Sequence, residues 1–425
     1  MSKEGFIKND IIANVGKLFS ANLLVQLLAL ATYPVLSRLF TPADFGLLAL
    51  FLSIGDIVGR MSTLSLEEAV LLPKRDKEAY SIVGVGAYAV GVVALLTFLF
   101  VLFNRFVVEV VEYPDSFFLL PVYVFVVGLL QLCAFLFNRY KLYKEISFSI
   151  SGMGVANALF RLGSGFFRLS YAALIVSTLL SQVVSLAIYV VGMVKRGLFR
   201  LFSFPTYGET KRVLAEYRQF PCYVMTRNFL NSLSGNLPLF MLIGAFGSTE
   251  VGLYSMAFTL AFRPVNVFSG SVYRVLFEKF SGLKNRGDQM MPIFAWYLKV
   301  VFAMALPVFL LAGYFAEELF GFVLGAEWGS SGGYFRIILP WIFMVLLSTP
   351  LASVALIFAK QKCAFWIDVV YLLLRVGALS VGIFFADMPL ALGLFSASGV
   401  AVMMLLLCCY FSWIKSYDKS RAIGE

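Results

Sequence analysis

The sequence predicts an all-α protein that crosses a membrane about twelve times. Of its 425 residues, 60% are hydrophobic and 14% are charged, whereas soluble domains contain about 45–50% apolar and about 25% charged residues. The mean hydropathy is +0.88. Apolar runs alternate with short charged segments, and a helix of about 20 apolar residues spans the hydrocarbon layer. These observations exclude a soluble enzyme.

Twelve apolar runs are long enough to span a membrane. They are continuous and do not alternate with polar residues, which favours helices over barrel strands. We predict spans at residues 18–37, 45–66, 80–103, 117–137, 146–167, 169–194, 220–246, 251–273, 292–315, 334–358, 364–385 and 389–413. The basic segment 195–219 separates six spans from six. We therefore predict an N-terminal six-helix bundle over 1–194, a cytoplasmic linker over 195–219 and a C-terminal bundle over 220–425.

Charged residues in the loops predict the orientation. Lys and Arg gather at the N-terminus, in the even-numbered loops and in the C-terminal tail, whereas acids such as Glu317 and Glu318 lie in the odd-numbered loops. Cytoplasmic loops carry the excess of basic residues, so both termini are predicted to be cytoplasmic. The net charge of +10 is scattered between apolar runs, which argues against nucleic-acid binding.

The sequence contains no histidine, which removes the usual general base near neutral pH and the commonest metal ligand. Its five cysteines form no CxxC pair and lie in apolar stretches. We therefore predict no catalytic residue, no metal site and no cofactor.

A weak repeat relates the two halves. The motif at 44–49, Asp-Phe-Gly-Leu-Leu-Ala, opens the second span, and Glu-Val-Gly-Leu-Tyr-Ser at 250–255 opens the eighth. Each places an acid where the positive end of a helix dipole favours it, with a glycine two residues later. An even number of spans per half makes the repeat parallel, and we expect the two bundles to surround a central cavity.

Three stretches resemble a known family. TYPVLSRLFTPADFGLLALF at 32–51, LSLEEAVLLPKRDKEA at 64–79 and GSTEVGLYSMAFTLAFRPVNVFSGSVYRVLFEKFS at 247–281 are similar to segments of the bacterial polysaccharide-biosynthesis transporters. These are the Wzx-type flippases of lipid-linked oligosaccharides, in the multidrug/oligosaccharidyl-lipid/polysaccharide (MOP) superfamily with the MATE exporters. Ser65 departs from the pattern, since a basic residue is expected near this position.

The resemblance implies a function and partners. It implies that the protein lies in the bacterial inner membrane and flips oligosaccharide units linked to undecaprenyl diphosphate for O-antigen, capsule or exopolysaccharide assembly. The implied partners are this lipid-linked substrate, membrane lipid and, in the same pathway, a polysaccharide polymerase and a chain-length regulator.

Charged residues inside the spans are the candidate site. A cation at mid-bilayer costs about 2.5–3.5 kcal/mol on insertion scales, so it rarely faces lipid. Five such cations outnumber two deep carboxylates, Asp56 and Asp368, so the excess requires water or an anionic ligand. We expect a cationic cavity that attracts a diphosphate, with these cations as ligands: Arg60, Arg227, Arg263, Lys299 and Arg375.

Three of these cations also have a simpler explanation, whereas Arg375 is a better ligand candidate. Asp56 and Arg60 are four residues apart and suit an intrahelical ion pair. Lys299 can snorkel to the interface, and Arg263 adjoins Pro264 at a possible kink. Arg375 lies seven residues from Asp368, about 10 Å along the helix, which is too far for direct pairing.

The seventh span is predicted to line the cavity. Arg227, Asn231 and Ser234 share one helix face, although Asn and Ser also join packed helices by hydrogen bonds. With no histidine available, a proton relay would require carboxylates, so Asp56, Glu67 and Asp368 are candidates for ion coupling. Glu67 can equally be solvated or pair with Lys74.

Two other functions remain open at this point. An ion-coupled MATE-like multidrug exporter would share the fold, although cationic drugs prefer an acidic cavity. A polytopic polysaccharide polymerase is the enzyme alternative, but such enzymes tend to carry a large outer loop or a catalytic histidine, and this sequence has neither.

Overall fold

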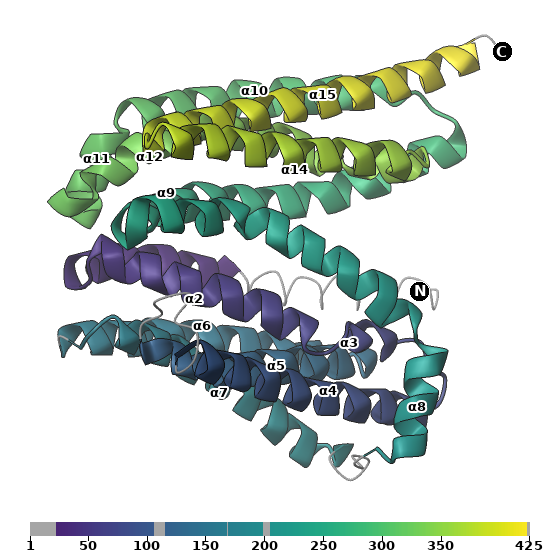
Figure 1. The fold of residues 1–425 in the computed structure, drawn as a ribbon. Helices are drawn as coiled ribbons and strands as arrows, with labels where there is room; N and C mark the ends of the chain where they lie inside the picture. Colours follow the sequence, from purple (N-terminus) through teal and green to yellow (C-terminus); the bar gives the residue numbers. More distant parts are fainter. Residues whose placement is uncertain (1–22, 106–114, 168, 199–204, 423–425) are drawn as a thin grey trace. The chain divides into compact units, whose positions relative to one another are not determined.

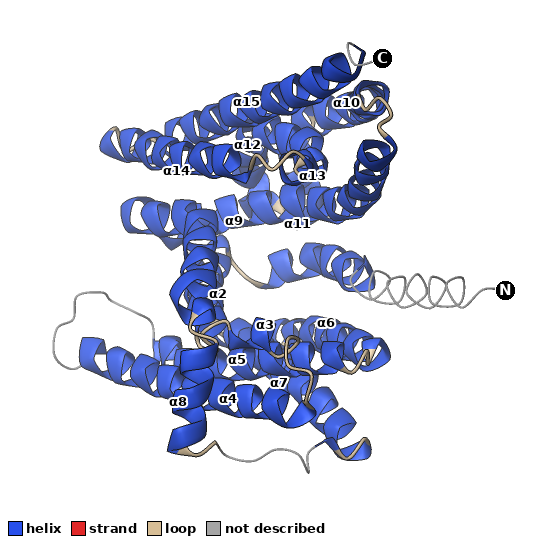
Figure 2. Ribbon diagram, turned by 90° about the vertical axis from the view of Figure 1, so that its right-hand side faces the viewer, coloured by secondary structure: helices blue, strands red, loops and turns tan. Residues whose placement is uncertain are grey.

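The computed structural model describes residues 23–105, 115–167, 169–198 and 205–422. Helices and connecting turns account for these residues, and no strand occurs among them (Figure 2). Helix Leu23–Leu39 comes first. The later elements are α2 (Pro42–Met61), α3 (Leu66–Ala69), α4 (Asp76–Phe103), η2 (Asp115–Leu119), α5 (Leu120–Arg139), α6 (Tyr143–Phe166), α7 (Ala172–Lys195), α8 (Tyr207–Glu216), η4 (Phe220–Val224), α9 (Met225–Arg286), α10 (Met291–Tyr314), α11 (Ala316–Leu324), η5 (Ala326–Trp328), α12 (Gly329–Ser348), η6 (Thr349–Leu351), α13 (Ser353–Ile357), α14 (Gln361–Phe384) and α15 (Met388–Ala422).

The all-α membrane fold is confirmed, and every predicted span coincides with a helical segment. Nine helices in the described ranges are long and apolar enough to cross a membrane. One of them, α9, holds both the seventh and eighth spans, because its backbone bends at Gly247 (φ 81°, ψ 176°) (Figure 1). Helix Leu23–Leu39 and α6 correspond to the first and fifth spans. Residues 18–22 of the first span lie outside the described residues.

The second span is shorter than predicted. Helix α2 ends at Met61, where residues 62–65 form a turn. Leu64 (φ 56°) and Ser65 (φ 54°) both adopt the left-handed conformation, which is unfavourable for residues other than glycine. Arg60 therefore lies in the last turn of α2 and not in the middle of a span.

The chain divides by its internal contacts into two units. Unit 1 comprises 1–40 and 47–236, and unit 2 comprises 41–46 and 237–425. The predicted boundary lay at the linker, whereas the contacts assign 220–236 to unit 1 and 41–46 to unit 2. Helices α2 and α9 consequently each belong to both units.

Unit 1 has an apolar core between α4, α5 and α7. Phe137 and Tyr189 meet there edge to face, with ring centroids 4.9 Å apart. The linker is not only a loop, since it contains α8, whose Val213 is buried in the same core. Thr206 and Glu209 form a reciprocal capping box at the start of α8.

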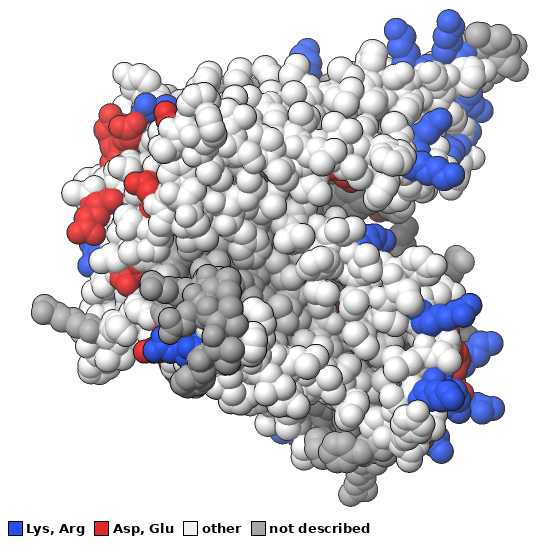
Figure 3. All heavy atoms as spheres, in the orientation of Figure 1, with Lys and Arg blue, Asp and Glu red and all other residues white. Residues whose placement is uncertain are grey.

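Unit 2 packs α12, α14 and α15 closely. A Cβ atom on Gly382 of α14 would lie 2.3 Å from the Cα of Ala391 in α15, so these backbones approach as small residues permit. Trp341 of α12 meets Phe395 of α15 edge to face at 5.0 Å. Acidic side chains gather at the α11 end of this unit, and basic ones gather near the end of α15 (Figure 3).

Candidate functional site

Asp56 of α2 forms a polar contact with α5 inside unit 1. The Tyr123 hydroxyl of α5 donates a hydrogen bond to Asp56 Oδ1 at 2.8 Å. The suggested intrahelical ion pair is wrong, because no Arg60 nitrogen lies within 4 Å of the Asp56 carboxylate. Arg60 is exposed in its own unit and remains a candidate for an anionic ligand.

Glu67 of α3 is 5% exposed and accepts a hydrogen bond from the Thr63 hydroxyl. It pairs with no lysine or arginine of the described chain within 4 Å, so neither simpler explanation for it holds. Burial raises the pKa of Glu67, and the Thr63 hydrogen bond lowers it by a smaller amount. A carboxyl with a raised pKa beside a left-handed turn remains a candidate for proton coupling.

We expect Glu67→Gln to stabilise the protein at pH 8. Since the pKa is raised, the native state binds the proton more tightly than the unfolded chain, whose pKa is about 4.3. The stability from protonating Glu67 is therefore fully present below about pH 4.3 and is lost as the pH rises through the native pKa. The gain in Glu67→Gln should be about 1.4 kcal/mol for each unit by which the pKa is raised. Thermal unfolding between pH 5 and pH 8 would measure it.

Glu209→Gln is the control of opposite sign. The backbone N–H of Thr206, followed by its hydroxyl, lowers the pKa of Glu209 by hydrogen bonding. This glutamine variant should therefore be less stable than the wild type at every pH above about 4.3, and should approach the wild type only as the pH falls further, through the lowered native pKa. Two outcomes would contradict these assignments: a Glu67→Gln difference that stays constant between pH 5 and pH 8, or a Glu209→Gln difference that stays constant as the pH falls below about 4.3.

The first part of α9 carries the polar face predicted for the seventh span. Arg227 and Asn231 are exposed within unit 1, and Ser234 is half-buried. Their neighbours serve as interhelical links, since Asn228 Nδ2 donates to Glu68 Oε1 at 3.3 Å, and Asn236 Oδ1 accepts from the Ser53 hydroxyl at 2.8 Å. Interhelical hydrogen bonding thus accounts for Asn228 and Asn236, whereas the cavity role of Arg227, Asn231 and Ser234 stays a prediction.

A polar ladder between α6 and α7 is a feature that the sequence analysis missed. Arg161 Nη2 donates to Thr178 Oγ1 at 2.8 Å, and Asn157 Nδ2 donates to Ser181 Oγ at 3.1 Å. The Ser149 hydroxyl also contacts Ser185. The spacing of Ser149, Asn157 and Arg161 on one helix face could have revealed it. These bonds satisfy polar groups inside the apolar unit.

Arg375 of α14 is the one deeply buried cation among the five predicted ligands. Its side chain is enclosed by aromatic rings, with its guanidinium carbon 3.9 Å from the ring centroid of Tyr371, 5.1 Å from Phe395 and 5.2 Å from Trp341. Nη2 donates to the Tyr371 hydroxyl at 2.6 Å, and Nε has no hydrogen-bond partner in the described chain. This aromatic cage holds the charge by cation–π attraction without a carboxylate.

The remaining candidates in unit 2 are more accessible. Lys299 of α10 and Asp368 of α14 are exposed, whereas Arg263 is half-buried beside Pro264 in α9. Asp368 forms no ion pair with Arg375. The structure thus places Arg60, Arg227, Asn231 and Ser234 in unit 1 and places Arg263, Lys299 and Arg375 in unit 2.

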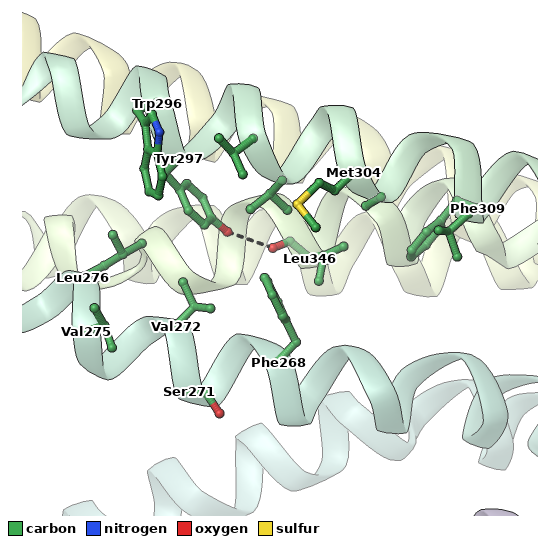
Figure 4. Close-up of a pocket in the computed structure, with 14 residues that line it drawn as sticks. Phe268, Ser271, Val272, Val275, Leu276, Trp296, Tyr297, Met304, Phe309 and Leu346 are labelled. Carbon is green, nitrogen blue, oxygen red and sulfur yellow. Dashed lines mark hydrogen bonds between the residues drawn. The ribbon is translucent and has the colours of Figure 1, made fainter.

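An apolar cavity of about 570 Å³ lies in unit 2 between α9, α10 and α12 (Figure 4). Side chains such as Phe268, Met304 and Leu346 line it. Its two hydroxyl groups are satisfied, because Ser271 donates to the Val267 carbonyl at 2.8 Å and Tyr297 donates to the Leu346 carbonyl at 3.1 Å. Only an apolar group matches these walls.

The two repeat motifs cross each other within unit 2. A Cβ atom on Gly46 would lie 1.9 Å from the Ser248 carbonyl oxygen, and one on Gly252 would lie 1.7 Å from the Pro42 carbonyl oxygen. Each glycine therefore lies against the carbonyl four residues before the other glycine. The crossing of Gly46 with Gly252 explains why both motifs carry glycine at this position.

Solved structures share this fold. An inward-facing multidrug resistance MATE transporter of the MOP superfamily is 15% identical, with 95% of each chain covered and a TM-score of 0.59. A mutant of the Vibrio cholerae MATE transporter VcmN is 14% identical, with 96% of this chain and 97% of that chain covered and a TM-score of 0.57. A MOP superfamily transporter from Pyrococcus furiosus, for which reverse polarity of the binding pocket suggests a different function, is 14% identical, with 95% and 96% covered and a TM-score of 0.56.

The fold is therefore that of the MATE transporters, with multiple helices that cross the membrane. The family model described as polysaccharide biosynthesis protein matches residues 35–332. The chain belongs to this polysaccharide biosynthesis protein family. No curated protein matches the chain.

Proposed function

We propose that this protein is a flippase that moves undecaprenyl diphosphate-linked oligosaccharide repeat units across the bacterial inner membrane. The translocated repeat units would supply O-antigen, capsule or exopolysaccharide assembly. In this proposal both termini are cytoplasmic, and the two six-helix bundles open alternately to either side. The diphosphate and sugars pass through a hydrated cationic cavity while the polyprenyl tail stays in lipid.

The unpaired cations carry this proposal. Arg60, Arg227, Lys299 and Arg375 form no ion pair with any carboxylate of the described chain. A cation in or beside a membrane span is costly unless water or an anion compensates it. Arginine matches a phosphate by two parallel hydrogen bonds. The family match over 35–332 supports a polysaccharide precursor as the source of that anion.

The apolar cavity beside α10 is suited to bind part of the hydrocarbon tail of such a substrate. Both hydroxyl groups in its walls are already hydrogen-bonded within the protein, whereas an isoprenoid segment would bury apolar surface there. In this proposal the cations bind the diphosphate head of the substrate, and the apolar cavity binds part of its polyprenyl tail.

Arg227→Ala should abolish polymer export while the protein level stays normal. Arg227 is exposed and unpaired, so its removal breaks no contact of the fold. Arg263→Ala should have the same effect on export. Arg286→Ala is the matched control, because Arg286 pairs with Asp288 near the end of α9, and its loss should leave export unchanged. Surface polymer and membrane protein level are the readouts.

The position of the accumulated precursor in a deletion strain distinguishes the three functions. Lipid-linked units retained on the inner leaflet support flipping, whereas accumulation on the outer leaflet would indicate a polymerase. Altered drug susceptibility with normal polymer would indicate a multidrug exporter. Normal export in both arginine variants would remove the cation-based mechanism.

A further inference from the structure

A polar pocket lies at one end of unit 1, apart from the candidate transport residues. It has a volume of about 380 Å³ and is formed where the turn between α5 and α6 meets the start of α4. Asp76, Asn138, Arg139, Lys141 and Tyr143 contribute to its lining. Basic side chains gather at this end of the unit, near α3, α8 and the start of α4 (Figure 3).

The charges in this pocket do not cancel. Arg139 Nη2 lies 3.1 Å from Asp76 Oδ1, and Nη1 donates to the Val70 carbonyl at 3.0 Å, so this pair is fixed and neutral. Lys141 also lines the pocket and forms no ion pair with the described residues. The pocket therefore carries one uncompensated positive charge. Four basic residues that form no ion pair in the described part of the chain flank it in sequence: Lys74, Arg75, Lys77 and Lys144.

The surface beside the pocket is apolar. Leu71 lines the pocket and is 42% exposed, and the next residue, Leu72, is 62% exposed. Phe148 is also exposed, and the Lys144 ammonium lies 5.9 Å from its ring centroid. Helices α4 and α5, which end or begin here, are apolar enough to span a membrane. A cationic pocket bordered by exposed apolar side chains at the end of spanning helices matches a lipid in both head and tail.

We propose that this pocket binds the phosphate headgroup of an anionic glycerophospholipid of the surrounding membrane. Lys141 supplies the attraction for the phosphate, while the Asp76–Arg139 pair holds the pocket open and Asn138 offers a neutral donor. The acyl chains lie against Leu71 and Leu72. The proposal concerns a resident lipid and does not depend on what the protein transports.

The conformation of Lys141 allows a sharp test. Lys141 (φ 56°) occupies the left-handed position after α5, where the Leu142 N–H donates to the Phe137 carbonyl at 2.9 Å. Glycine is the preferred residue at this position of such a helix end. Lys141→Gly thus removes the charge and relieves backbone strain, so weaker lipid binding cannot be attributed to unfolding. Ala386→Gly is the matched control, because Ala386 (φ 52°) ends α14 in the same way without a charge.

The experiment measures lipid retention by native mass spectrometry of the full-length protein. Phosphatidylglycerol, cardiolipin and phosphatidylcholine are the probes, with inorganic phosphate as a competitor. We expect the wild type and Ala386→Gly to prefer the two anionic lipids, and we expect Lys141→Gly to bind phosphatidylglycerol about fivefold more weakly. Equal binding of phosphatidylcholine, unchanged binding by Lys141→Gly, or displacement by millimolar inorganic phosphate would overturn the proposal. Polymer export is not a readout, so this result is independent of the flippase assignment.

Discussion

Gly252→Ala is expected to destabilise the protein strongly. The added Cβ would lie 1.7 Å from the Pro42 carbonyl oxygen, and the nearby atoms belong to backbone that no side-chain rotation can move. Overpacking of this kind costs about 1–3 kcal/mol and occasionally more, against a gain of about 1 kcal/mol from the better helix former. An overlap with backbone atoms should cost an amount at the upper end of this range, so we expect the free energy of unfolding to fall by at least about 2 kcal/mol. Gly46→Ala should behave alike. Monodisperse protein yield and thermal unfolding in detergent measure the effect.

Gly270→Ala is the matched control for this substitution. Gly270 lies in the same helix, α9, but a Cβ atom there meets nothing within 4 Å. This variant should fold normally and gain up to about 1 kcal/mol from helix propensity. If Gly252→Ala were as stable as Gly270→Ala, the close approach at the crossing of Gly46 with Gly252 would be refuted.

Arg375→Met should separate transport from folding. Replacing a buried charge by an apolar side chain of similar length removes a desolvation cost, and the lost cation–π attraction is worth about 2 kcal/mol when desolvated. These terms nearly cancel, so the variant should remain within about 2 kcal/mol of the wild type. Under the proposed function, loss of the guanidinium should abolish export. Thermal unfolding of the variant measures its stability, and the surface polymer of the same strain measures its export.

Arg375→Lys tests whether charge alone suffices. A lysine keeps the positive charge but lacks the planar fork that stacks on the Tyr371 ring and donates to its hydroxyl. We expect reduced export with normal protein level. Full export by Arg375→Met would show that the aromatic cage is a structural contact and would remove Arg375 from the proposed substrate site.

The sequence predicted the spans well because hydrophobic length is a local property. Its errors arose where tertiary contacts decide. Nothing in the apolar run around Met61 indicates that the helix stops there, because the left-handed turn at Leu64 and Ser65 is held by packing of α3. Likewise the basic linker concealed α8, whose single buried residue, Val213, needs a partner from unit 1.

The candidate site was predicted by residue type but not by environment. Spacing alone suggested that Asp56 would pair with Arg60, whereas Tyr123, 67 residues later, provides the actual contact. The aromatic cage of Arg375 combines residues of α12, α14 and α15, so no local pattern could show it. The repeated glycine was visible in the sequence, but its cause lies in the backbone that crosses it.

The exchange of segments between the two units bears on how such a chain could arise. Residues 41–46 come from the first half of the sequence and pack in unit 2, while 220–236 come from the second half and pack in unit 1. This reciprocal exchange of segments has the topology of a domain-swapped dimer. Two halves made as separate chains would have to meet at sufficient concentration before either unit was complete. Fusion into a single polypeptide makes the swap intramolecular, and assembly then no longer depends on dilution.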